Sequence, residues 1–319
     1  MAHNLEMING KAQMFFKGQA PWHNLGREVT GNLSVNEAIN AAGLNWSVAL
    51  KDLQTVAGEA VTHKASYRTD TGAILGVVGP QYTLLQNQDA FNWFSPFVTS
   101  GEAAFETAGS LRDGRRVWAL AKINRDPMKI VGDDVVEKYI LLSNSHDGSM
   151  AVRVGFTPIR VVCENTLTMS INNSKSSLIR LSHTKNVVDN LEEIREVMNV
   201  ANASFESTAE QYRGLAQKNI NSSDLEKYVR IVFGCEDTTG ERKSRVLEPI
   251  TNLFENGRGN NLAGVRGTYW AAYNAITEYV QYDRGTGAIE DKRLNETWFG
   301  SGMVLNKKAL STALIMAGV

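Results

Sequence analysis

The chain has little cysteine and no metal-binding pattern of histidine. Only two of its 319 residues are cysteines, Cys163 and Cys235, too few for a disulfide framework and typical of a reducing cytoplasm. The five histidines are scattered, without the short spacings to one another or to cysteine that structural zinc requires. Adjacent acidic residues such as Asp133 and Asp134 are more typical of a solvated surface than of a magnesium site. We therefore expect no metal and no other cofactor.

The chain also lacks an excess of charge of one sign and long apolar runs. Its 33 Lys and Arg against 34 Asp and Glu leave a formal charge of -1, which excludes a protein that coats nucleic acid over its whole surface; any such site must be a local patch. The longest apolar runs, such as residues 309–319, fall short of the roughly 18 residues of a membrane helix. Residues 1–11 have no apolar segment typical of export. We expect a cytoplasmic protein without a membrane partner.

Motifs of several enzyme classes are absent. There is no G-x-S-x-G elbow, no H-E-x-x-H helix and no strand followed by G-x-G-x-x-G, and the glycine-rich segment 256–261 is not followed by the Gly-Lys-Ser/Thr of a phosphate-binding loop. Cys163 ends an apolar strand, where cysteine usually acts as a small hydrophobe rather than a nucleophile. These patterns do not support a catalytic function.

Turn and cap motifs, in contrast, are plentiful in the first half of the chain. Ser34 and Glu37 form a capping box that predicts a short helix ending near Gly43. Asp-Gly or Asp-Thr-Gly turns separate three pairs of alternating segments, and such turns tolerate the positive φ of a tight hairpin. The predicted hairpins are 61–69 with 73–78, 104–112 with 115–122, and 139–144 with 150–157.

The second half of the chain is predicted to be helical. From Val187 to Leu215 apolar residues recur in alternating steps of four and three, with Thr208 as the one polar position. This seam either packs across the sheet or, in the alternative interpretation, packs partly against a neighbouring subunit. Further expected segments are a strand at 159–163, a helix at 165–171, helices at 225–233, 246–254, 268–282 and beyond 298, and a linker at 236–243.

Taken together, these patterns predict an α+β protein, with an antiparallel hairpin-rich sheet region followed by a helical region. The expected division is an extended N-terminal arm over residues 1–30, a β-hairpin and helix domain over 31–185, and a helical domain over 186–319.

Basic residues near aromatic residues are the most suggestive chemical feature. Arg153 is expected on the strand face opposite Val152 and Val154, with Arg160 on an adjacent strand segment beside it. Arginines and backbone amides in the glycine-rich loop can cradle phosphates, and nearby aromatic rings can stack bases. The alternative is that the arginines form only the wet face of a sheet, and that the aromatic residues are core. The predicted nucleic-acid contacts are Arg153, Arg160, Arg180, Lys185, Arg258, Arg266, Trp270 and Tyr273.

Several motifs spread over most of the chain form a specific combination. They are Pro21-Trp22-His23-Asn24-Leu25-Gly26, Tyr82, Gln86-Asn87, Ala90-Phe91, Thr107–Leu111, Arg116-Val117-Trp118, Thr157–Leu167, Arg180, His183, Gly267–Trp270 and Asn274-Ala275. Together they resemble the phage/plasmid-like domain-of-unknown-function family of mobile genetic elements. The resemblance implies a phage or plasmid origin and a bacterial host cell, and it implies no established reaction. Hairpins followed by a helix also look like the core of phage single-strand annealing proteins, an analogy of architecture.

The resulting hypothesis is a non-catalytic, homo-oligomeric protein, a ring or filament, that binds single-stranded DNA and assists annealing or recombination. The alternative is a phage interaction protein that binds and modulates a host protein through the Val187–Leu215 seam. A third interpretation, a metal-dependent nuclease, needs a carboxylate cluster that only the fold could assemble.

Overall fold

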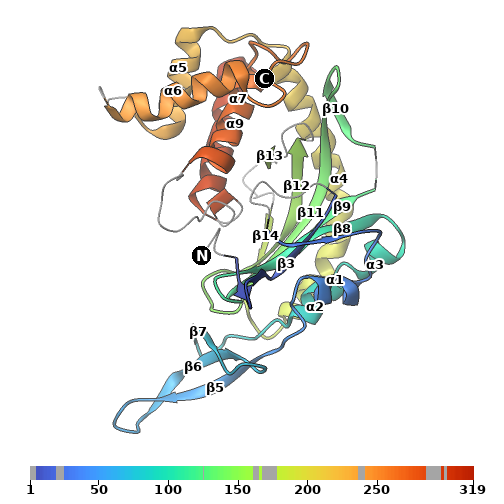
Figure 1. The fold of residues 1–319 in the computed structure, drawn as a ribbon, viewed down its shortest axis with the longest axis vertical. Helices are drawn as coiled ribbons and strands as arrows, with labels where there is room; N and C mark the ends of the chain where they lie inside the picture. Colours follow the sequence, from blue (N-terminus) through green and yellow to red (C-terminus); the bar gives the residue numbers. More distant parts are fainter. Residues whose placement is uncertain are drawn as a thin grey trace. The chain divides into compact units, whose positions relative to one another are not determined.

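The computed structural model describes residues 5–18, 25–124, 126–160, 165–166, 178–235, 241–284, 296–297 and 300–319; within these, the side chains of residues 160, 165–166, 178, 190–204 and 241–245 are left aside (Figure 1). Strands dominate the N-terminal half of the chain, and helices follow toward the C-terminus. The chain is therefore an α+β protein, as the sequence predicts.

The chain forms two compact units, and neither is a continuous stretch. The first contains Met1–Arg125, Tyr139–Phe156 and Leu178–Asn199, and the second contains Asp126–Lys138, Thr157–Ser177 and Val200–Val319. This division differs from the expected boundaries at residues 30 and 185, because long elements begin in one unit and end in the other. These elements are β11 (Asp134–Ser145), β12 (Val152–Arg160) and α4 (Val187–Ala216).

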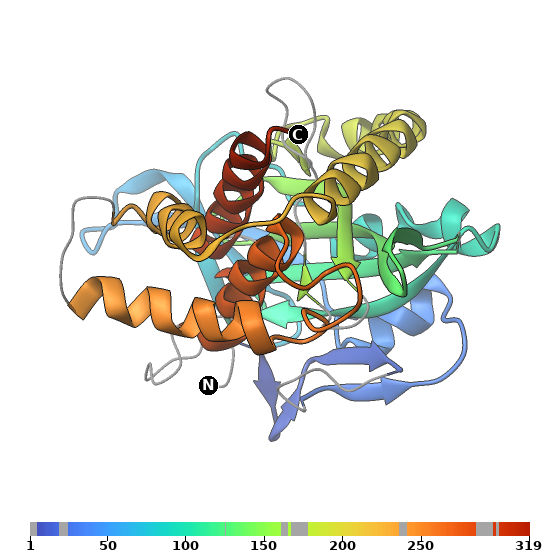
Figure 2. The ribbon, with the colours of Figure 1, turned by 90° about the horizontal axis from the view of Figure 1, so that it is seen from above.

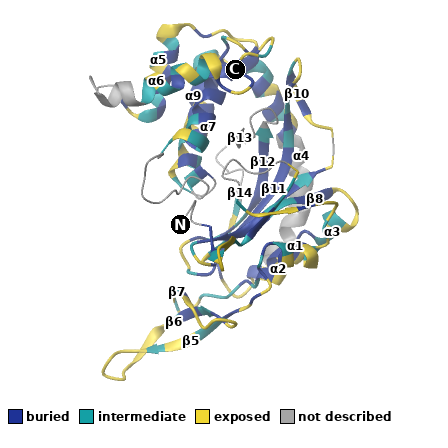
Figure 3. Ribbon diagram, in the orientation of Figure 1, coloured by how far each residue is buried: buried dark blue, intermediate teal, exposed yellow. Residues whose placement is uncertain are grey.

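The largest sheet has nine strands, in the order β13-β12-β11-β9-β8-β3-β4, with β10 beside β11 and β14 beside β12. Besides β11 and β12, its strands are β3 (Met14–Lys17), β4 (Arg27–Val29), β8 (Ala103–Leu111), β9 (Arg116–Ile123), β10 (Met128–Val131), β13 (Asn165–Thr166) and β14 (Leu178–Leu181). A separate three-stranded sheet contains β5 (Val48–Gln54), β6 (Ala60–Arg68) and β7 (Ile74–Val78). In Figure 3 the strands β8, β9 and β11 are largely buried, whereas the tip of the β5–β6 hairpin is exposed.

All three predicted hairpins are confirmed. Strands β6 and β7 pair antiparallel, as do β8 and β9, and β11 lies beside β12. In the β8–β9 turn, Arg112, Asp113 and Gly114 have φ of 56°, 56° and 83°, which is the left-handed conformation that Asp-Gly turns accommodate.

The N-terminal segment is more than an extended arm. Strand β3 pairs with β8 antiparallel and with β4 in parallel, and Phe15 on β3 is fully buried. Two short strands, β1 (Met7–Ile8) and β2 (Lys11–Ala12), pair ahead of it. The segment is polar on average, which predicts an arm outside the core. Its short apolar run from Met14 to Phe16 nevertheless forms a strand of the sheet.

Three short helices accompany the strands of the first unit: α1 (Val35–Ala41), α2 (Asn87–Asn92) and α3 (Ser95–Thr99). The capping box predicted for α1 is present. The Ser34 hydroxyl accepts a hydrogen bond from the Glu37 amide, and the Glu37 carboxylate accepts one from the Ser34 amide at 2.8 Å. The Ser34 hydroxyl also donates to the Glu37 carboxylate at 2.7 Å. This hydrogen bond, and then the one from the Ser34 amide, lower the pKa of Glu37 from its ordinary value.

Replacing Ser34 with alanine is expected to lower the free energy of unfolding by about 1 kcal/mol, because the first turn of α1 loses its acceptor. Ser34→Asn retains a capping oxygen and should leave stability within a few tenths of a kcal/mol of wild type. Urea denaturation of the two variants measures the difference. Equal losses in both would contradict a capping role.

The second unit contains the end of α4 and the helices that follow it (Figure 2). These are α5 (Ser222–Phe233), α6 (Glu241–Asn256), α7 (Tyr269–Glu278), which continues as a π-helical turn (Tyr279–Asp283), and α9 (Ser301–Ala317). Helix α7 packs against α6 and α9, and α5 packs against the same two helices. Gly234 ends α5 in the left-handed conformation with φ of 63°, at the predicted position.

Two predicted segments of the C-terminal region are wrong where they are described. Asn165 and Thr166 form β13, paired with β12, instead of starting a helix. The expected linker 236–243 overlaps α6, which already begins at Glu241. Residues 161–164, 167–171 and 236–240 lie outside the described part of the chain.

The long helix predicted from Val187 to Leu215 is confirmed as α4. Four described positions of its apolar seam are fully buried within the chain: Val187, Phe205, Tyr212 and Leu215. At these positions the seam is part of the protein's own core. The side chains of its other members, Leu191 to Ala201, lie outside the described residues.

Candidate nucleic-acid interface

Two arginines lie directly opposite each other on the neighbouring strands β12 and β14. Arg153 on β12 pairs in register with Arg180 on β14. The Cβ atoms of directly opposed residues on antiparallel strands are about 5 Å apart, and like charges at that spacing destabilise the sheet. Arg153 is half-buried and Arg180 is exposed, so solvent reaches the pair.

Strand alternation directs Arg153 to this position. Val152 and Val154 are fully buried, and Phe156 is nearly so, on the other face of β12. Because successive side chains of a strand point to opposite faces, Arg153 lies away from these apolar residues. This is the arrangement that the sequence predicts for Arg153.

A third arginine joins the pair from strand β9. Arg116 begins β9, opposite Ser145 at the end of β11, and its Nη2 donates a hydrogen bond to the Ser149 hydroxyl at 3.1 Å. Burial, and then the positive charges of Arg180 and Arg116, lower the pKa of Arg153 from its ordinary value. The positive charges of Arg180 and Arg116 are therefore both close enough to act on Arg153. We call Arg116, Arg153 and Arg180 the arginine cluster.

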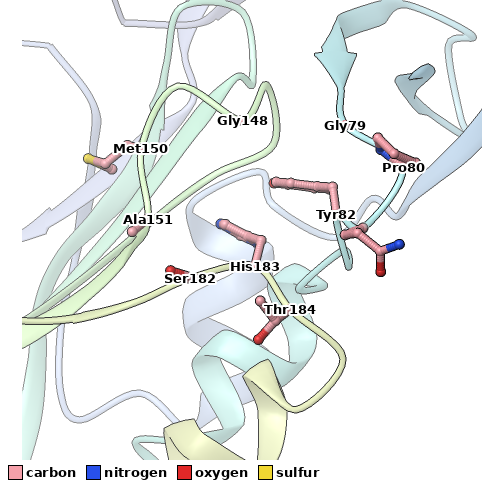
Figure 4. Close-up of a pocket in the computed structure, with 10 residues that line it drawn as sticks. Gly79, Pro80, Tyr82, Gly148, Met150, Ala151, Ser182, His183 and Thr184 are labelled. Carbon is pink, nitrogen blue, oxygen red and sulfur yellow. The ribbon is translucent and has the colours of Figure 1, made fainter. Parts of the chain in front are cut away.

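An open pocket of about 390 Å³ lies beside the arginine cluster in the first unit. Its lining includes Tyr82, Ala151, Ser182 and His183, together with the loop that carries Gly148 (Figure 4). The Tyr82 and His183 rings stack, with centroids 4.5 Å apart and planes 21° apart. The pocket thus combines an aromatic pair with small residues on the strand ends.

Hydrogen bonds to the backbone hold both rings in place. The Tyr82 hydroxyl donates to the Ser145 carbonyl at 2.7 Å, and His183 Nδ1 donates to the Thr83 carbonyl at 3.1 Å. Burial lowers the pKa of His183, although the backbone carbonyls of Thr83 and Met150 oppose the change. Burial and the charge of Asp147 raise the pKa of Tyr82 well above its ordinary value. Both rings are therefore uncharged at neutral pH.

Two further predicted contacts, one on β12 and one just after β14, are not part of the arginine cluster as defined. Arg160 lies on β12 itself, seven positions beyond Arg153, instead of on an adjacent strand segment. The expectation that these two arginines lie side by side is therefore wrong, and the Arg160 side chain lies outside the described residues. Lys185 is exposed in the turn that follows β14.

The predicted contacts of the glycine-rich loop, Arg258 and Arg266, belong to the second unit, whereas the arginine cluster belongs to the first. Arg258 is exposed, but its Nε lies 3.9 Å from Glu278 Oε1 and its guanidinium carbon lies 4.7 Å from the Tyr282 ring centroid. Its backbone amide also donates to the Glu278 carboxylate at 3.1 Å. A carboxylate already balances the charge of this arginine. Arg266 is exposed in the second unit.

The predicted base-stacking role of Trp270 and Tyr273 is wrong. Both side chains are fully buried, and both pack with Tyr212, at ring-centroid distances of 4.7 and 6.2 Å. Trp270 Nε1 also donates to Asp134 Oδ2 at 2.7 Å. These two residues are core, because a base can stack only on a ring whose face is open to solvent.

Two features of the described residues concern metal ions and membranes. Within that part of the chain, no group of three or more His, Cys, Asp or Glu side chains is placed to hold a metal ion. None of the helices described above combines the length and the apolar character needed to cross a bilayer.

Comparison with known proteins identifies a family. The model of a domain of unknown function, DUF932, matches residues 74–298. The chain belongs to this family. No curated protein and no solved structure matches it.

The DUF932 match contains the whole candidate interface. It begins with β7 at Ile74 and includes the arginine cluster and every residue that lines the pocket. Strands β1 to β6 precede it. The candidate interface is thus a feature of the DUF932 region itself.

Sequence reasoning left Arg116 and Tyr82 out of the predicted contact set. Arg116 begins β9 two residues after the turn residue Gly114, which places it at a strand end. Only the sheet order, in which β11 alone separates β9 from β12, shows that this end lies near Arg153. Tyr82 carried no local signal, since its partner His183 lies 101 positions away.

Proposed function

We propose that this DUF932 protein binds single-stranded DNA non-catalytically, with backbone phosphates held by the arginine cluster. In this proposal it is encoded by a phage or plasmid and assists annealing or recombination of mobile DNA in the bacterial cytoplasm. The observation that supports it most is the register of Arg153 against Arg180, with Arg116 close enough to lower the pKa of Arg153.

A phosphate is the ligand that this arrangement favours. Two opposed guanidinium groups repel each other, and an anion between them turns the repulsion into attraction. Arginine binds phosphate through two parallel N–H donors, which makes it better suited to this task than lysine. Exposed Arg180 and, five residues on, exposed Lys185 extend the positive charge along the chain, which fits a polyanion better than a single phosphate.

The small number of contacts implies that several copies act together. A cluster of three arginines on a chain with a net charge of -1 gives modest affinity for each subunit. Several subunits on one strand raise the overall affinity through effective concentration. We therefore include a homo-oligomer, a ring or filament, in the proposal, and light scattering with and without an oligonucleotide tests it.

The double variant Arg153→Gln/Arg180→Gln is expected to bind a labelled oligonucleotide more weakly and with a shallower salt dependence. Removing one arginine from a phosphate should reduce the slope of log Kobs against log salt by about 0.7, so removing the pair should reduce it by about 1.4. Fluorescence anisotropy titrations at several salt concentrations measure the slope.

Arg258→Gln is the matched control, because Glu278 already balances the charge of Arg258. It should leave the slope at its wild-type value. Absence of binding by the wild type at low salt, or an unchanged slope in a folded double variant, would refute the proposal.

The alternative of a host-protein partner has weaker support. It relied on the Val187–Leu215 seam as a docking surface, and the described seam residues Phe205, Tyr212 and Leu215 are fully buried within the chain. A surface that is already covered cannot receive a partner without unfolding.

A further inference from the structure

We propose that the pocket formed around Tyr82 and His183 receives one unpaired nucleobase of the strand whose phosphates lie on the arginine cluster. This inference rests on the proposed function and specifies what the same site recognises. It assigns the pocket to a base, as distinct from a second phosphate or an unrelated metabolite.

The sheet register places the pocket and the arginine pair on one face. Ala151 and Ser182, which line the pocket, precede Arg153 and follow Arg180 by two residues each. Residues two apart on a strand share a face and lie about 7 Å apart. Ala151 directly precedes β12 and Ser182 directly follows β14. Continued by one residue, the register that pairs Arg153 with Arg180 and Val152 with Leu181 places Ala151 opposite Ser182. A phosphate on the arginine pair and a base in the pocket are therefore neighbours along one strand.

The lining of the pocket suits a base. Its volume of about 390 Å³ is of the size that small ligands occupy, about 300–1,000 Å³. Tyr82 is half-buried and keeps part of its ring accessible beside the His183 imidazole, which gives a stacking platform of the kind used by single-strand binders (Figure 4). Exposed Ser182 and Thr184 supply hydroxyl groups to the edge of a stacked ring.

Charge argues against an anion in the pocket itself. Both aromatic rings are neutral at pH 7, and the Asp147 carboxylate is close enough to raise the pKa of Tyr82. A phosphate in the pocket would meet this negative charge, whereas a phosphate at Arg153 and Arg180 would meet positive charge. The site thus separates into a cationic part for the backbone and an uncharged part for the base.

The close approach between the loop beside the pocket and strand β7 needs glycine at two positions, one on each segment. Gly148 has φ of 73°, and a Cβ there would lie 3.1 Å from Val78 Cγ1 and 3.9 Å from Tyr82 Cε2. On the facing strand β7, a Cβ at Gly76 would lie 2.7 Å from Asp147 Cα. The loop and β7 therefore approach each other more closely than larger residues allow, and this approach shapes the wall of the pocket.

The test compares two oligonucleotides with the same number of phosphates, an oligothymidylate and its abasic analogue, by fluorescence anisotropy. The wild type should prefer the base-containing strand by about 5- to 160-fold, the fold-change equivalent of about 1–3 kcal/mol of stacking on one base. Tyr82→Leu should abolish this preference and leave the salt slope unchanged. Tyr82→Phe keeps the ring and should keep the preference.

A second variant guards against loss of folding in Tyr82→Leu. Ser182 is exposed, and Ser182→Leu fills the pocket from its rim, so it should also abolish the preference. Tyr67→Leu removes a half-buried aromatic ring from β6 and serves as the matched control, with the preference retained. A wild type that binds both oligonucleotides equally, or a folded Ser182→Leu variant that keeps the wild-type preference, overturns the base pocket. In that case a salt slope that still depends on Arg153 and Arg180 leaves the proposed function standing.

Discussion

Trp270→Ala is expected to lower the free energy of unfolding by about 3–5 kcal/mol, the range for deleting a large buried aromatic side chain. Trp270 is fully buried between Tyr212 and Tyr273, and its indole Nε1 donates to Asp134, which is itself fully buried. The substitution leaves a cavity and removes a donor from a buried carboxylate. Chemical denaturation followed by circular dichroism measures the loss.

Trp270→Phe separates the two contributions. It keeps most of the ring but not the N–H, so it should cost about 1.5–3 kcal/mol, the value of a hydrogen bond to a charged group. Because Trp270 is core, the folded Phe variant should bind an oligonucleotide as the wild type does. Wild-type stability together with weakened DNA binding would instead place the indole at a ligand surface.

The sequence contained a signal for the burial of Trp270. Helix α7 has a single charged residue, Glu278, and all ten of its residues from Tyr269 to Glu278 are buried. A helix that is apolar around most of its surface belongs in a core. The proximity of Trp270 and Tyr273 to the glycine-rich loop suggested a ligand surface, but the scarcity of charged residues was the better guide.

Local turn and cap chemistry made much of the first unit predictable. The three hairpins depend on Asp-Gly turns and α1 on its capping box, and each of these acts over a few residues. Pairings between distant segments were not predictable in this way. The parallel pair β3–β4 and the pairing of β14 with β12 depend on which surfaces meet after folding.

In the candidate interface, too, local sequence predicted some features and only the folded chain shows the others. Alternation along β12 predicted the direction of Arg153, because it needs only neighbouring residues. The position of Arg180 opposite it needs the register of β14, which follows a stretch of chain with no strong pattern. Arg160 shows the same limit of local patterns. The sequence pattern assigned it to a separate strand segment, whereas it lies on the same strand as Arg153, seven positions further along.

Lowering the pH from 7.5 to 5 is expected to reduce the free energy of unfolding by about 2 kcal/mol through His146 alone. His146 is fully buried, and its ring packs edge-on against Trp46 at a centroid distance of 5.3 Å. Asn87 donates its amide protons to the Leu44 and Trp46 carbonyls, which orients its oxygen toward His146 Nε2 at 2.9 Å. His146 Nε2 therefore carries the proton, and Nδ1 is buried without a hydrogen-bond partner.

This environment opposes a second proton on the ring. Burial lowers the pKa of His146 to about 3, with help from His183 and Arg68 and against the effect of Asp147. The unfolded chain has the ordinary histidine pKa of about 6.5 and binds the proton first as the pH falls. The contribution to stability is thus complete above pH 6.5 and is lost at about 1.4 kcal/mol per pH unit as the pH falls toward the folded pKa.

His146→Gln tests this assignment, because glutamine can donate to Asn87 but does not titrate. We expect lower stability than wild type at pH 7.5 and a flatter dependence between pH 6 and 5, where most carboxylates remain ionised. His63→Gln, at an exposed histidine on β6, should retain the wild-type profile. Denaturant titrations at half-unit pH steps give the slopes, and equal slopes for wild type and His146→Gln would show that the buried ring takes up its proton without unfolding.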